Sequence, residues 1–226
     1  MELSPEEARV LACLIEKETV VPDSYPLTLN ALRLACNQTT NRHPVVAYDD
    51  RTVEAALLSL KSMGLVRFVH PSHGGRTIRY RHAVDERWRL STPELGALAA
   101  LVLRGPQTTS EVRMRAERHL AAGDSPNSAE EVLDALAARS PDPFAVRLER
   151  RAGEREARWA HALTGKIDDD LGPPPPEADV DPDAAGDRPP ENRVAGSDLA
   201  QDVAELWARV ERLERLLGLE EDVSSG

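Results

Sequence analysis

The stretch Leu34-Ala35-Cys36-Asn37-Gln38-Thr39-Thr40-Asn41-Arg42-His43-Pro44-Val45 decides the fold of the first part of this chain. It begins as the end of an apolar helix and continues as an unusually polar loop. Amphipathic helices are predicted on either side, near residues 4–19 and 51–63, and strand-like runs follow at 65–69 and 77–82. Three helices followed by a two-stranded wing are the winged form of the helix-turn-helix. The polar stretch therefore lies at the corner before the recognition helix.

Local signals place the ends of these helices. Ser4, Pro5 and Glu7 form the pattern of an N-cap with a capping box. Thr28 is the predicted cap of the second helix, and Asp49 or Asp50 that of the third, which ends at Gly64. The predicted core positions of the second and third helices are Leu29, Leu32, residues 34–36, Val53, Ala56, Leu57 and Leu60.

The same plan is repeated in residues 85–164. Ser4 matches Ser91 at an offset of 87 residues, the third-helix core positions match at 76, and Arg79 matches Arg158 at 79. Three matches in the same order indicate an internal duplication. Helices are predicted near 91–104, 108–120 and 127–139, and strands near 144–149 and 156–162. The smaller offset at the third helix predicts that the second copy lacks the 37–42 loop.

The composition changes after residue 164. Residues 165–197 are rich in proline and acidic side chains, which predicts an extended, disordered linker. Residues 198–219 follow with apolar side chains at alternating spacings of four and three, the pattern of a coiled-coil seam. We predict a homodimer through this helix, with folding back onto the winged domains as the alternative. The seam residues are Leu199, Val203, Leu206, Val210, Leu213 and Leu217.

Together these patterns predict a mainly α fold with small β-wings. It comprises two tandem winged helix-turn-helix domains at 1–84 and 85–164, the linker at 165–197 and a C-terminal coiled-coil helix at 198–219.

Charge is distributed unevenly along the 226 residues. The net charge is −11, yet residues 1–84 carry +1 and residues 85–164 carry −1, so the acidity belongs to the tail. The two domains are close to neutral and have room for a local basic patch. The acidic N-terminus and the lack of a long apolar run predict a cytoplasmic protein without a membrane partner. Cys13 and Cys36 are expected to be buried, reduced thiols.

The residues from Leu34 to Val45, followed by residues 53–66, resemble the signature region of the YceH family of bacterial proteins. The resemblance spans roughly residues 1–163. It implies a tandem winged-helix fold and carries over no substrate, partner or site residue.

The candidate interface for double-stranded DNA is the polar loop with the first turn of the third helix and the first wing. Amide and guanidinium groups read base edges, and arginines bind phosphates. In the alternative reading, the loop residues only close the loop through their own hydrogen bonds. The candidate residues are Asn37, Gln38, Thr39, Thr40, Asn41, Arg42, Arg51, His73, Arg76, Arg79 and Arg81.

Two further functional hypotheses come from the same residues. An exposed Leu58 and the acidic third helix of the second copy favour a protein scaffold, because winged helices also dock proteins. The second copy carries its positive charge on its second helix and its wing, and we expect it to position the first copy on a duplex or to bind protein. Catalysis is the weakest hypothesis, since no nucleophile elbow, phosphate loop or nucleotide fingerprint occurs. No Cys, Asp or Glu cluster completes a metal site with His70, His73 and His82, and no cofactor is expected.

Overall fold

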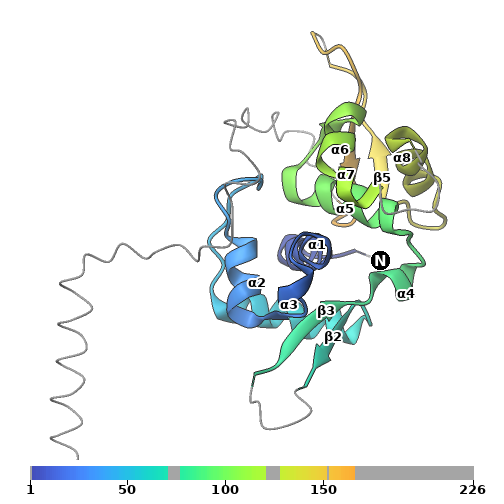
Figure 1. The fold of residues 1–226 in the computed structure, drawn as a ribbon. Coiled ribbons are helices and arrows are strands. Elements are labelled where there is room, and N and C mark those ends of the chain that lie inside the picture. Colours follow the sequence, from blue (N-terminus) through green and yellow to red (C-terminus); the bar gives the residue numbers. More distant parts are fainter. Residues whose placement is uncertain (1, 71–76, 121–127, 152, 166–226) are drawn as a thin grey trace, which may run out of the picture. The chain divides into compact units, whose positions relative to one another are not determined.

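The computed structural model describes residues 2–70, 77–120, 128–151 and 153–165. The chain divides into two compact units, residues 1–177 and 178–226, and all described residues belong to the first. The predicted linker and coiled-coil helix, including Leu199, Val203, Leu206, Val210, Leu213 and Leu217, lie outside the described residues. The structure is a helical fold with small antiparallel sheets, which agrees with the predicted fold class at this level (Figure 1).

The first half of the compact unit contains three main helices and a hairpin. Its elements are α1 (Pro5–Val20), η1 (Pro22–Ser24), β1 (Leu27–Thr28), α2 (Leu29–Cys36), α3 (Asp50–Ser62), β2 (Val66–Val69) and β3 (Arg79–His82). The predicted caps are confirmed: Ser4 forms a capping box with Glu7, Thr28 accepts from the backbone of Ala31, and Asp49 accepts from Thr52. The carboxyl end of α3 is followed by Gly64 at φ +75°, a backbone conformation that glycine adopts without strain.

The second half has the same order of elements. These are α5 (Thr92–Arg104), β4 (Gln107–Thr108), α6 (Thr109–Arg115), α7 (Glu117–Leu120), α8 (Ala129–Ala137), β5 (Ala145–Arg147) and β6 (Arg158–His161). Ser91, Thr108 and Ser128 each form a capping box with a glutamate three residues later.

The two sheets share one topology. Their strand orders are β1-β3-β2 and β4-β6-β5, and all pairs are antiparallel. Leu27 pairs with Tyr80 in the first sheet, and Gln107 pairs with Trp159 in the second. The two-residue strands β1 and β4 were not expected from the sequence, because two residues are too few to show an alternating pattern.

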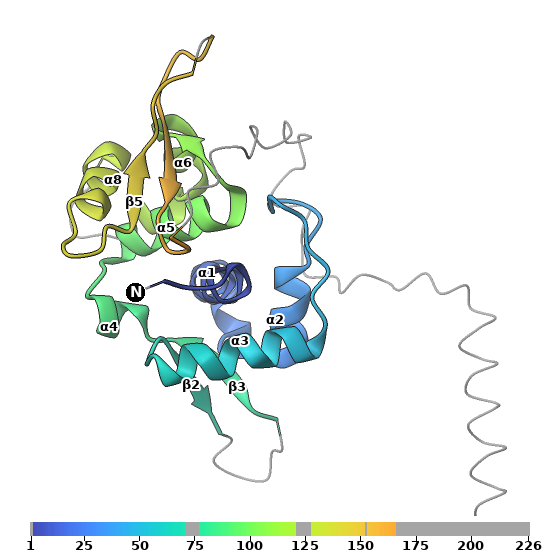
Figure 2. The same ribbon diagram turned by 180° about the vertical axis from the view of Figure 1, so that it is seen from behind.

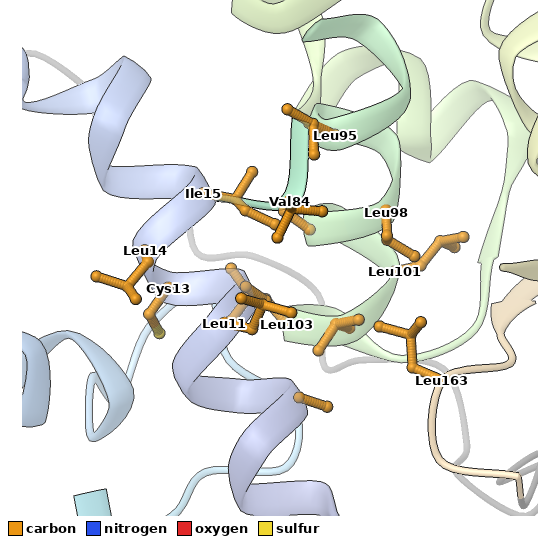
Figure 3. Close-up of a cluster of buried hydrophobic side chains, with 14 of the residues drawn as sticks. Leu11, Cys13, Leu14, Ile15, Val84, Leu95, Leu98, Leu101, Leu103 and Leu163 are labelled. Carbon is orange, nitrogen blue, oxygen red and sulfur yellow. The ribbon is translucent and has the colours of Figure 1, made fainter. Parts of the chain in front are cut away.

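The core is continuous between the halves because α1 and α5 pack against each other. Ile15 and Leu11 on α1 meet Leu98 and Leu103 on α5 (Figure 3). Residues 93–103 of α5 are all buried, as expected for a helix that is covered on every side. The segments that precede α1 and follow β6 join the same contact, since the Leu3 N–H donates to the Leu163 carbonyl at 2.8 Å.

Two local predictions are wrong, and one short element was not predicted. Leu34, predicted to face the core, is 46% exposed, because the buried face of the short α2 consists of Leu32, Ala35 and Cys36. The predicted helix at 108–120 is broken at Ala116 into α6 and α7. A further short helix, α4 (Val84–Trp88), joins the halves, and its five residues are too few to show helical periodicity.

The prediction about the missing loop is also wrong. The offset between equivalent caps has already fallen from 87 at Ser4 and Ser91 to 80 at Thr28 and Thr108. Most of the shortening therefore precedes the second helix of the second half. The loop at 37–49 has a counterpart at 116–128 that contains α7.

Candidate nucleic-acid interface

The loop between α2 and α3 is closed by one of its own polar residues. The Asn37 side chain donates from Nδ2 to the Tyr48 carbonyl at 2.8 Å, and its Oδ1 accepts from the Tyr48 N–H at 2.8 Å. Both functional ends of the amide are therefore used to hold the two ends of the loop together. The Asn37 side chain therefore closes the loop, as the alternative interpretation of the sequence expected.

Arg42 does not belong to the exposed interface. Its residue is 5% exposed, and its guanidinium donates to both carboxylate oxygens of Glu16, at 3.0 and 2.6 Å, and to the Ala35 carbonyl at 3.1 Å. Burial alone would raise the pKa of Glu16, but the charge of Arg42 and its hydrogen bonds lower it overall. The prediction that Arg42 contacts DNA is corrected: a bidentate pair with α1 occupies its donors.

The same loop also binds the second half of the molecule. The His43 N–H donates to the Leu103 carbonyl of α5 at 2.8 Å, and Arg9 of α1 donates to the Pro44 carbonyl at 2.6 Å (Figure 2). Arg104, in the last turn of α5, is near Arg42 and Glu16, and its pKa is lowered to about 10 by burial and by the charge of Arg115. The loop thus joins α1 to α5, a role that no local sequence signal indicates.

The remaining loop residues are at the surface. Gln38 is half-buried, while Thr39, Thr40 and Asn41 are exposed, and Asn41 adopts a left-handed conformation with φ 59°. Arg51 is exposed in the first turn of α3 and has no hydrogen-bond or ion-pair partner among the residues that the structure describes. These five residues retain hydrogen-bonding groups in reach of a partner.

Farther along α3 the exposed face is mixed, since Leu58 lies there together with the exposed charged residues Glu54 and Lys61. Leu58 is 60% exposed, while the predicted core positions Val53, Ala56, Leu57 and Leu60 are all buried. Asp50 forms an ion pair with Arg33 of α2 at 2.7 Å, which neutralises one acidic group at the start of the helix. The exposed face of α3 therefore combines Arg51 in the first turn with the apolar Leu58, while Lys61 near the other end lies over the Phe68 ring.

The arginines of the first hairpin, β2 and β3, are engaged within the molecule. Arg67 and Arg81 both pair with Glu86 of α4. Arg79 donates to the Pro26 carbonyl at 2.8 Å and more weakly to the Ser24 carbonyl. Their charge is thus partly satisfied before any phosphate arrives. His73 and Arg76, also predicted as contacts, lie outside the described residues.

The second half presents opposite charges on different elements. The exposed side of α8 carries Glu130, Glu131 and Asp134, which would repel phosphates. Arg113 on α6 is exposed, and its neighbour Met114 is as well. Further arginines lie on the hairpin that joins β5 and β6.

The two cysteines lie inside the first half. Cys13 and Cys36 are free and fully buried. The neighbouring Cys13 thiol, and then burial, raise the pKa of Cys36 far above its ordinary value.

Neither a metal site nor a membrane segment is found in the described part of the chain. No three His, Cys, Asp or Glu side chains of those residues are grouped as metal ligands. None of their helices has the length and apolarity needed to cross a bilayer.

Comparison with known proteins places these features in a family. A family model described as "Protein of unknown function, DUF480" matches residues 3–154. A UPF0502 protein of Geobacter sulfurreducens is 48% identical over 166 residues, covering 74% of this chain and 74% of that protein. A UPF0502 protein of Geobacter metallireducens is 42% identical over 217 residues, covering 96% and 86%. One from Chromobacterium violaceum is 45% identical over 165 residues, covering 73% and 74%.

Proposed function

The chain belongs to the DUF480 family, which confirms the YceH-type resemblance, and we propose that it is a non-catalytic tandem winged-helix protein that binds double-stranded DNA. The repeated order of elements and the matching strand orders support two winged helices, one in residues 1–84 and one in 85–164. Transcriptional regulation is the role that we attach to this binding. A cytoplasmic location and a homodimer through residues 198–219 complete the proposal.

The observation that carries the proposal is the free Arg51 in the first turn of α3. In helix-turn-helix proteins the first turn of the recognition helix contacts base edges in the major groove. An arginine there binds a backbone phosphate or, through two hydrogen bonds, guanine. The preceding loop adds the exposed or half-buried side chains of Gln38, Thr39, Thr40 and Asn41. The Asp50 carboxylate is already paired with Arg33, which weakens its repulsion of phosphates.

The test is a salt titration of the full-length protein with a random duplex of about 30 base pairs. Arg51→Ala should weaken binding at about 0.1 M salt by roughly tenfold and reduce the salt slope by about one unit, as expected for one lost phosphate contact. Arg67→Ala is the matched control, because it removes the same charge from a side chain paired with Glu86. Equal losses in both variants would mean that only net charge matters and would refute an interface at α3.

A scaffold function has separate support. Leu34 and Leu58 are exposed apolar side chains on α2 and α3, and the exposed side of α8 is acidic. Large exposed apolar side chains suit a protein partner better than a phosphate backbone. If the full-length protein does not bind duplex at about 20 mM salt, where even weak phosphate contacts become visible, the scaffold function replaces DNA binding.

A further inference from the structure

The hairpin between β5 and β6, residues 145–161, concentrates arginine outside the core. We call it the second hairpin. Five of its residues are arginines, and Figure 1 shows it projecting beyond α6 and α8. Its backbone is held in place by the Leu148 N–H, which donates to the Arg158 carbonyl at 2.7 Å, and by the Glu154 N–H, which donates to the Arg151 carbonyl at 3.1 Å.

The Glu154 carboxylate of the second hairpin is occupied by partners within the hairpin. Glu154 accepts from the Arg151 N–H through Oε2 at 3.1 Å and pairs with Arg158 through Oε1 at 2.7 Å. Both oxygens therefore have partners within the hairpin. This arrangement shapes the tip and leaves Glu154 little capacity to neutralise the other arginines.

Two arginines of the second hairpin are left without such partners. Arg150 and Arg155 are exposed, and neither has a hydrogen bond or ion pair to any residue that the structure describes. Arg147 is exposed as well, and its guanidinium lies 5.8 Å from the centre of the Trp159 ring. Stacking on an aromatic face leaves the edge of a guanidinium free to donate.

The first hairpin differs in this respect. Arg67 and Arg81 share Glu86, and Arg79 donates to backbone carbonyls, so each must exchange a partner before it can bind a phosphate. Arg150 and Arg155 exchange only water and counterions. Since release of counterions drives phosphate binding, unpaired arginines contribute more to it than paired ones.

We propose that the second hairpin is a phosphate-contacting element for duplex DNA, and that Arg150 and Arg155 bind the sugar-phosphate backbone. The inference rests on the proposed function and adds to it the part of the partner that this hairpin recognises. The sequence predicted hairpin contacts from the first half. In this proposal the second half supplies the hairpin that contacts phosphates, and the first half supplies α3. The exposed carboxylates Glu149 and Glu156 oppose the same contact, which provides a control of opposite sign.

The experiment is a salt titration of the full-length protein on a random duplex of about 30 base pairs, with three double or single variants. Arg150→Ala/Arg155→Ala should lower the salt slope by about two units and weaken binding at about 0.1 M salt by 50-fold or more, on the order of eightfold per phosphate contact. Glu149→Gln/Glu156→Gln should strengthen binding, because it removes repulsion while keeping side-chain size. Arg67→Ala should leave the slope nearly unchanged.

The outcomes separate this inference from the proposed function. If Arg51→Ala weakens binding and Arg150→Ala/Arg155→Ala does not, DNA binding stands and the second hairpin is not involved. If only the hairpin variant loses slope, the hairpin assignment stands and the interface at α3 is refuted. A glutamine variant that fails to strengthen binding also overturns the hairpin assignment. Absence of duplex binding at about 20 mM salt overturns both.

Discussion

The connections that follow the second helix differ between the halves, yet each reaches the first helix of the other half. The loop at 37–49 donates from the His43 N–H to Leu103 of α5. In the second half, α7 carries the buried His119, whose ring lies close enough to Ile15, Glu16 and Glu18 of α1 for them to act on its pKa. A polar loop and a helical turn thus serve the same structural purpose. The comparison teaches that a polar segment next to a recognition helix can be used for packing, which leaves α3 and the second hairpin for a partner.

The largest expected effect is on the ion pair that anchors the first connection. Glu16→Gln should destabilise the protein by about 3 kcal/mol, because it leaves the buried Arg42 guanidinium without its counter-charge. Urea unfolding at neutral pH measures the loss. Glu86→Gln is the control: it removes the partner of Arg67 and Arg81 from an exposed site and should cost less than about 1 kcal/mol. Similar losses in the two variants would show that the first connection is not anchored by charge.

The second connection, which contains α7, should be disrupted by one methyl group added at Gly96. A Cβ on Gly96 of α5 would lie 2.2 Å from the His119 Cβ, so Gly96→Ala should destabilise by about 2 kcal/mol. An unhindered glycine within a helix would give the opposite sign, since alanine there stabilises by roughly 0.5–1 kcal/mol.

A double variant tests the cause of that loss. If the clash is responsible, Gly96→Ala/His119→Ala should lose less stability than the sum of the two single variants in urea unfolding. Additive losses would mean that the methyl group acts elsewhere on α5.

Removing the two hydrogen bonds that close the first loop should give a smaller effect. Asn37→Ala removes two hydrogen bonds to the Tyr48 backbone and should cost about 1–2 kcal/mol. Thr40→Ala, an exposed change in the same loop, should stay within about 0.5 kcal/mol. Thermal unfolding of both variants provides the comparison, and an equal response would mean that the Asn37 amide does not hold the loop.

Local chemistry made most of the helices predictable. Ser4, Thr28 and Ser91 begin helices because their side chains cap the backbone a few residues later, a signal contained within one turn. Strands β1 and β4 and the helix α4 escaped prediction because such short elements depend on partners that are distant in the sequence. Tyr80 and Trp159 provide those partners for the two short strands.

The candidate site was harder to predict because the charge of an arginine does not show whether its side chain points into the protein or into solvent. Arg42 and Arg51 were predicted as contacts at the same corner, yet Arg42 turns inward to Glu16, 26 residues earlier, and Arg51 remains exposed. The sequence also did not show which hairpin arginines are in ion pairs, since the pairing of Arg67 with Glu86 depends on where α4 lies. A predicted contact residue is therefore informative only when the acidic residues within its reach are known.

The smallest effect is expected from pH, and it concerns only the second connection. Burial lowers the pKa of His119 below its ordinary value of 6.5, so the folded state binds a proton there less readily than the unfolded state. This stability is fully present above the ordinary value and is lost as the pH falls from there through the folded-state pKa. Unfolding free energies of the wild type and His119→Asn, measured between about pH 5 and 8, isolate this contribution. The wild type should lose more stability on acidification than His119→Asn. Parallel stability profiles of the two proteins would show that His119 is not held neutral at the contact with α1. Only the first connection would then be shown to join the two halves.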